Sequence, residues 1–119
     1  MSLPAMPEGK IFNSAVSGDA DILGADLNLP ADYDSLAVRV TVGISSTTAI
    51  LRVAIDDGTT TEKLDFNGGT ALTTGSLYTF TFGAMRADAG GDLLGYNFEL
   101  SAGTTIDYML VEFIRDGVI

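Results

Sequence analysis

The chain has 119 residues, no Cys and no His, and sixteen acidic against six basic residues, which gives a formal net charge of −10. This length suits one domain with its own core, and the missing residue types exclude disulfides, thiolate metal sites and serine–histidine or cysteine–histidine catalysis. The acidic balance argues against a nucleic-acid or anionic-membrane partner, because phosphate binding depends on clustered Lys and Arg.

Residues 1–10 are predicted to form a flexible N-terminal arm, because Pro4 and Pro7 stand among small residues and disrupt both helices and central strands. The arm has neither the basic start nor the apolar run of a signal peptide, and no later segment has the roughly 20 apolar residues of a transmembrane helix. We therefore expect a chain that is made and folded in the cytoplasm, with residues 11–119 as a single domain.

The first half of this domain predicts strands over 10–17 (KIFNSAVS) and 19–29 (DADILGADLNL), which Pro30 and a loop over 31–35 then end. Residues 35–45 alternate with a period of two and predict a strand. One face of that strand consists of Leu36, Val38, Val40, Val42 and Ile44. Residues 49–56 and 59–66 then predict a hairpin around Asp57-Gly58, because Gly accepts a positive φ at low cost.

Turns are predicted at Asn67-Gly68-Gly69 and at residues 73–75, with Leu72 between them at the edge of the core. Residues 77–82 (LYTFTF) and 96–101 (YNFELS) mix aromatic and β-branched residues as strands do, and the glycine-rich segment 86–95 is predicted to be a loop. The last predicted strand, 105–114 (TIDYMLVEFI), is apolar on both faces. One face carries Met109, Val111 and Phe113, and the other Ile106, Tyr108, Leu110 and Ile114.

A strand that is apolar on both faces either lies in the centre of a covered sheet or forms part of a subunit interface. No segment has helical spacing over a useful length, so the whole pattern predicts an all-β protein. Seven or eight short strands with frequent turns indicate an antiparallel β-sandwich, either jelly-roll-like or immunoglobulin-like, and leave the strand order open.

Carboxylates are the remaining candidates for chemistry. The pairs that are close in sequence are Asp19 with Asp21, Asp32 with Asp34, and Asp56 with Asp57. None fits the twelve-residue calcium loop, although weak calcium binding stays open. The chain has no Trp as a sugar platform, and its glycine pairs lack the Lys-Ser/Thr and the helix of a phosphate loop. We therefore predict a non-enzymatic protein with no catalytic, cofactor-binding or metal residues.

Three features favour self-association: the apolar last strand, the Pro-bearing arm and the hydrophobic tail Gly117-Val118-Ile119. The segments FNGGTALTTGSLYTFTF (66–82), YNFELSAGTTIDYMLVEFI (96–114) and DGVI (116–119) resemble the small β-rich accessory proteins of tailed-phage virions, especially capsid decoration (cement) proteins. The resemblance covers about residues 36–119 and consists of Thr/Gly/Ala-rich strands, an Asn-Gly-Gly turn and an apolar last strand.

The resemblance implies a structural protein of the virion surface that docks on the major capsid protein lattice of an assembled bacteriophage head, commonly as a homotrimer, and stabilises the shell. It also implies that the arm reaches neighbouring subunits and that the last strand lines a self-interface. The interface residues expected on this basis are Leu3, Pro4, Met6, Pro7, Ile11, Phe12, Ile106, Tyr108, Leu110, Ile114, Val118 and Ile119. The alternative is a receptor- or glycan-binding β-sandwich module of a phage tail, a fibre or a cell-surface filament.

Overall fold

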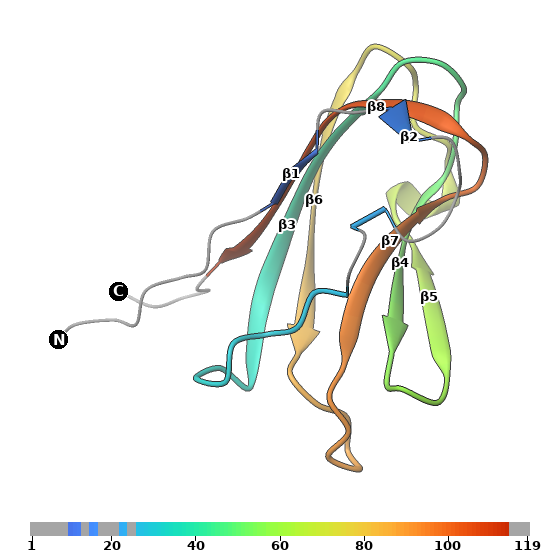
Figure 1. Cartoon of the computed structure of the whole chain (residues 1–119). Coiled ribbons are helices and arrows are strands. Elements are labelled where there is room, and N and C mark those ends of the chain that lie inside the picture. Colours follow the sequence, from blue (N-terminus) through green and yellow to red (C-terminus); the bar gives the residue numbers. More distant parts are fainter. Residues whose placement is uncertain (1–9, 13–14, 17–21, 24–25, 115–119) are drawn as a thin grey trace, which may run out of the picture.

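Two antiparallel β-sheets pack face to face in the computed structural model, which describes residues 10–12, 15–16, 22–23 and 26–114 (Figure 1). The first sheet has the order β1-β8-β3-β6, with β2 also paired to β8, and the second has the order β5-β4-β7. The predicted antiparallel β-sandwich is therefore confirmed. The strands are β1 (Lys10–Phe12), β2 (Ala15–Val16), β3 (Ser35–Ile44), β4 (Leu51–Asp56), β5 (Thr61–Asp65), β6 (Leu77–Met85), β7 (Gly95–Leu100) and β8 (Thr104–Ile114).

The core lies between the two sheets and follows the alternation of β3. Val40, for example, is fully buried and lies opposite Phe80 of β6 and Val111 of β8. Because side chains alternate between the two faces of a strand, this register places the even-numbered residues of β3 and β6 in the interior. The largest fully buried side chains are Phe98, Ile44, Leu51, Leu72, Leu100, Ile106, Met109, Val38, Val40, Val42, Val53 and Val111.

An aromatic cluster fills the interior between β6 and the second sheet. The Phe66 ring, just after β5, stacks on Phe80 with a centroid distance of 5.2 Å. Phe82 packs against Tyr96 at 5.8 Å and edge-on against Phe98 at 6.2 Å. These offset and edge-to-face contacts are the arrangements that aromatic rings prefer, so the aromatic residues predicted to face the interior join the two layers.

The strand pairing is nested: β3 pairs with β8, and β4, which follows β3, pairs with β7, which precedes β8. The two connections between these pairs, 45–50 and 101–103, therefore run side by side at one end of the sandwich. There the Thr104 Oγ1 atom, which is buried, accepts the N–H of Thr47 at 3.1 Å and lies 3.0 Å from Ser46 Oγ. Thr104 therefore provides a hydrogen-bond partner for backbone N–H groups of the 45–50 connection, which have no partner strand there.

The short helical turn η1 (Asn67–Gly69) confirms the turn predicted at these residues. Asn67, Gly68 and Gly69 have φ angles of 57°, 64° and 81°, a left-handed run that requires small side chains. The chain then returns to the first sheet, and Leu72 is fully buried on the way, as its position between two turns predicts.

The prediction of a strand over 19–29 is wrong for its described residues, 22–23 and 26–29, which contain only an isolated bridge from Leu27 to Tyr96. The segment still covers the free edge of β7. The Ile22 N–H donates to the Phe98 carbonyl at 3.1 Å, whereas the next N–H, that of Leu23, donates to the side-chain Oδ1 of Asn97 at 3.0 Å. A side-chain acceptor has replaced the backbone ladder here. Because Leu23 and Asn97 are 74 positions apart in the sequence, the local pattern of alternation could not predict this contact.

A register shift in β8 changes the predicted face of Ile106. Gly43 lies opposite Tyr108, but the next residue, Ile44, lies opposite Ile106, so that Asp107 is the extra residue of a bulge. Ile106 therefore turns into the core and is 1% exposed. It does not share a face with Tyr108 and has no surface to offer a partner, contrary to the prediction from strict alternation.

Candidate functional site

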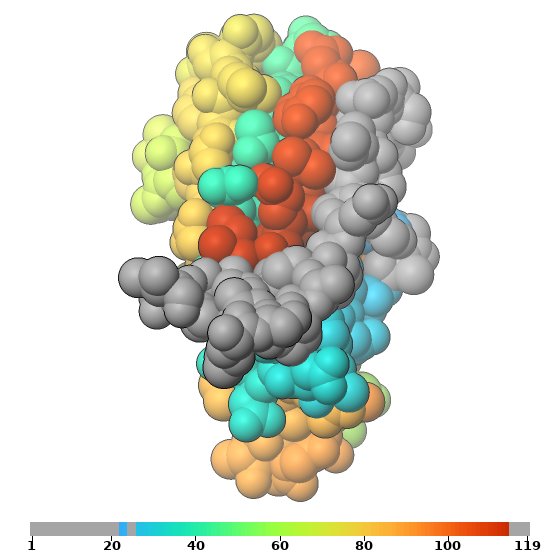
Figure 2. Space-filling model, turned by 90° about the vertical axis from the view of Figure 1, so that its left-hand side faces the viewer, coloured from blue at the N-terminus to red at the C-terminus, as the bar shows by residue number. Residues whose placement is uncertain are grey.

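The outer face of the first sheet is rich in threonine and apolar residues. It is formed by the odd-numbered residues of β3 and β6 and by the β8 residues opposite them, and Figure 2 shows β6, β3 and β8 side by side on it. One ion pair lies in the middle of this face, where Arg39 Nε donates to Glu112 Oε1 at 3.0 Å. We call this surface the docking face; its residues are Ala37, Arg39, Thr41, Gly43, Leu77, Thr79, Thr81, Gly83, Met85, Tyr108, Leu110, Glu112 and Ile114.

The structure places three of the predicted interface residues, Tyr108, Leu110 and Ile114, on the docking face, where each is half-buried. Ile11 pairs with Leu110 and Phe12 with Met109 through the backbone of β1. The other predicted interface residues apart from Ile106 lie outside the described part of the chain, and these are Leu3, Pro4, Met6, Pro7, Val118 and Ile119. Sequence reasoning missed the two most exposed large hydrophobic residues of the face, Leu77 (65%) and Met85 (57%), because they share a strand with the aromatic core residues.

The outer face of the second sheet has the opposite character, because charged side chains cover it. Arg52 of β4 donates to Asp65 of β5 at 2.9 Å, and Lys63 of β5 lies 3.0 Å from Glu99 of β7. Surface ion pairs of this kind contribute little to stability but keep a face well hydrated. The two outer faces therefore differ in polarity, with one ion pair on the docking face and two on the opposite face.

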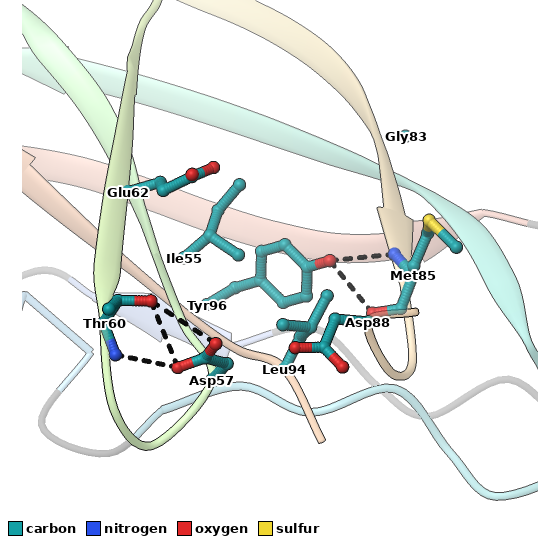
Figure 3. A pocket seen from close by; sticks show the side chains of 9 residues that line it. All are labelled: Ile55, Asp57, Thr60, Glu62, Gly83, Met85, Asp88, Leu94 and Tyr96. Atoms are coloured by element: carbon teal, nitrogen blue, oxygen red, sulfur yellow. Dashed lines mark hydrogen bonds between the residues drawn. The ribbon is translucent and has the colours of Figure 1, made fainter. Parts of the chain in front are cut away.

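A second candidate site is an open pocket of about 340 Å³ at one end of the sandwich (Figure 3). It lies between the β4–β5 hairpin on one side and the end of β6 with the β6–β7 loop on the other. Its walls combine apolar side chains with carboxylates. The lining residues are Ile55, Asp57, Thr60, Glu62, Gly83, Met85, Asp88, Leu94 and Tyr96.

Tyr96 fixes the apolar side of this pocket. Its hydroxyl accepts the N–H of Met85 at 2.8 Å and donates to the Met85 carbonyl at 2.9 Å, as Figure 3 shows. Burial raises the pKa of Tyr96, and the hydrogen bond from the Met85 N–H partly opposes that rise. The hydroxyl is thus already committed to the end of β6 and is not a free general acid.

On the other side, Asp57 holds the hairpin turn. Its Oδ1 atom accepts the N–H groups of Thr59 and Thr60, each at 2.8 Å. The hydrogen bond from Thr60, followed by that from Thr59, lowers the pKa of Asp57, because both stabilise the carboxylate. The role expected from the sequence, a structural turn at Asp57-Gly58, agrees with this geometry.

Asp57 also belongs to a cluster that local sequence spacing does not reveal. One carboxylate oxygen each of Asp57, Asp88 and Asp92 lies within 4.8 Å of the others. Three carboxylate oxygens could be part of a site for a hard cation such as Ca²⁺, which binds six to eight oxygen ligands in all. The Asp88 Oδ1 atom, however, already accepts the N–H groups of Gly90 and Asp92. Asp57 and Asp88 therefore each have a structural role in one of two facing turns.

Comparisons with protein-family models, curated proteins and solved structures find no significant match to this chain. Among the described residues, no helix has the length and apolar character needed to cross a bilayer.

Proposed function

We propose that the chain is a non-catalytic structural protein of a virion, and specifically a capsid decoration protein that binds the outer surface of an assembled phage head. The sequence resemblance to virion accessory proteins suggests this class. The β-sandwich is compatible with it, and the pocket supports catalysis poorly, because its tyrosine hydroxyl and two of its carboxylates are engaged in local hydrogen bonds.

The difference between the two outer faces is the observation that carries the proposal. The docking face offers threonine hydroxyls and apolar side chains around one ion pair, whereas the opposite face carries two ion pairs over three strands. Protein interfaces contain fewer Lys, Glu and Asp residues, and more Arg, than the rest of the surface. We therefore assign the docking face to the shell and the charged face to solvent, where it helps to keep particles of net charge −10 per chain apart.

Stabilisation of the shell would follow from mass action. A protein that binds the assembled lattice, and not its dissociated subunits, shifts the equilibrium toward the intact shell. Many copies on one closed shell, together with self-association into a homo-oligomer, add avidity, so each contact can be individually weak. This mechanism needs no reactive group and no cofactor.

A receptor- or glycan-binding module of a tail, fibre or filament is the second candidate, and the pocket is the observation that favours it. Carboxylates commonly accept hydrogen bonds from sugar hydroxyls, and the pocket provides those of Asp57, Asp88 and Glu62. The two candidates use different surfaces: the pocket for a glycan and the docking face for a shell.

Cosedimentation separates the two candidates. Bare heads are assembled from the major capsid protein of the phage genome that encodes this chain. The chain should sediment with these heads, and the bound amount should saturate at a fixed number of copies per head. The same heads should then resist heat better. The proposal would be overturned if the protein stayed in the supernatant at every concentration. If an immobilised glycan array also retained the protein, the second candidate would be favoured.

A further inference from the structure

β6 is an edge strand with the properties of an interface. Among the described residues, no strand pairs with its outer edge. It has nine residues and lies within residues 66–85, the longest stretch of the sequence without a charged residue. Exposed edges are normally protected by charge, Pro, bulges or short length. β5, the edge strand of the second sheet, has such protection, because its five residues (TEKLD) include three charged ones.

The backbone of β6 presents unpaired groups at regular intervals. Its register on β3 has no bulge over nine residue pairs. The Arg86 N–H, one residue beyond β6, donates to the Asp34 carbonyl, so even-numbered residues direct their backbone groups toward β3. The odd-numbered residues then direct theirs outward. Met85 is satisfied by Tyr96, which leaves the N–H and C=O groups of Leu77, Thr79, Thr81 and Gly83.

We propose that two copies of the chain pair along β6 in antiparallel orientation, with the two-fold axis at Thr81. This register places Leu77 opposite Met85 of the second copy. These are the two most exposed large hydrophobic residues among those the structure describes, at 65% and 57%, and each covers the other. Thr79 then lies opposite Gly83 of the second copy, where a side chain at Gly83 would meet only open space.

Electrostatic repulsion between two copies limits where they can meet. Two chains that each carry a net charge of −10 repel one another over most of their surfaces. Of the edge strands in the described part of the chain, β6 is the longest that has no charged residue, so approach along it has the smallest repulsion. The antiparallel pairing would add about six backbone hydrogen bonds through residues 79, 81 and 83 of both copies. The first sheets of two copies would join into one continuous sheet.

The inference goes beyond the proposed docking on a shell and does not depend on it. An isologous two-fold contact closes at two copies, so the expected species is a dimer and not the trimer that the sequence resemblance implies. The contact is tested on the chain alone, without capsid. Failure of the pairing is therefore distinguishable from failure of the decoration function.

Light scattering on the wild-type chain tests the copy number, and substitutions at the axis test the surface. We expect twice the 12.4 kDa chain mass. Thr81→Asp and Thr81→Lys should each weaken dimerisation by about tenfold or more, because the axis places two like charges opposite one another. Thr81→Asp makes the net charge of the chain more negative and Thr81→Lys makes it less negative. A loss of dimer in both variants is therefore not an effect of net charge. The same substitutions at Thr61, an exposed residue of β5, are the controls and should leave the mass unchanged.

Cysteine cross-linking tests the register of the two strands. Its readout is the yield of disulfide-linked dimer at each position, which a folding defect would not raise. The chain has no Cys, so Thr81→Cys introduces one thiol per copy at the axis. Opposed residues of an antiparallel hydrogen-bonded pair have Cα atoms about 5.5 Å apart, a distance that a disulfide spans. Thr81→Cys should therefore cross-link nearly completely under mild oxidation and Thr79→Cys only slowly. A monomeric or trimeric wild type, or equal cross-linking at both positions, would overturn the proposal.

Discussion

The hydroxyl of Tyr96, on β7 of the second sheet, forms two hydrogen bonds with the backbone of Met85, on β6 of the first sheet, at 2.8 and 2.9 Å. One polar side chain therefore joins the two sheets at the end of the sandwich where the pocket lies. The same contact closes one end of the free β6 edge and forms a wall of the pocket.

Tyr96→Phe should lower the free energy of unfolding by about 1–3 kcal/mol, because it leaves a backbone donor and acceptor without their partner. Tyr78→Phe is the matched control. The Tyr78 hydroxyl accepts one N–H, from Thr73, at an exposed site, where water replaces the lost bond. Urea unfolding of both variants provides the measurement, and equal destabilisation by the two substitutions would contradict this role for Tyr96.

Alkaline pH should reduce the contribution of Tyr96. Because its pKa is raised in the folded state above the ordinary value of 10.0, the protonated form stabilises the fold. That stability is fully present below pH 10 and is lost as the pH rises through the folded pKa, since the unfolded chain deprotonates first. The difference in unfolding free energy between wild type and Tyr96→Phe should therefore be smaller at about pH 10.5 than at about pH 8. A difference that stays constant or grows would count against the assignment.

Thr104→Val should destabilise the chain by about 1–3 kcal/mol, although it preserves shape, because it removes the acceptor for N–H groups of the 45–50 connection. Thr105→Val is the control, since this neighbouring side chain is only half-buried and bonds no group of that connection. Thermal unfolding monitored by circular dichroism distinguishes them. If both variants melt at the wild-type temperature, the bend does not depend on Thr104.

The alternation of apolar residues was sufficient to predict β3, the hairpin and the inward aromatic residues, because those features depend on local spacing. The face of Ile106 was not predictable, because a single-residue bulge inverts the parity and leaves no clear mark in the sequence. The cluster of Asp57 with Asp88 was missed for a different reason. These residues are far apart in sequence and meet only because the hairpin and the β6–β7 loop reach the same end of the sandwich, and this depends on strand order.

Asp92→Asn should raise the melting temperature at low salt, because it removes one of three clustered negative charges. Asp92 is the suitable member to change, since it is exposed, whereas Asp57 and Asp88 accept backbone N–H groups. The gain should shrink in about 1 M NaCl, where the Debye length falls to about 3 Å. A lower melting temperature would contradict this effect of the charge. Stabilisation of the wild type, but not of the variant, by added Ca²⁺ would instead indicate a cation site.

Charge reversal on the two outer faces tests most directly whether the first sheet is the surface that contacts the shell. Arg39→Glu and Arg52→Glu each break one exposed Arg–carboxylate pair, on the docking face and on the charged face respectively. In cosedimentation with bare heads, Arg39→Glu should bind at least about tenfold more weakly than wild type, whereas Arg52→Glu should bind as wild type does. Unchanged binding of Arg39→Glu, or loss of binding with Arg52→Glu alone, would contradict the assignment.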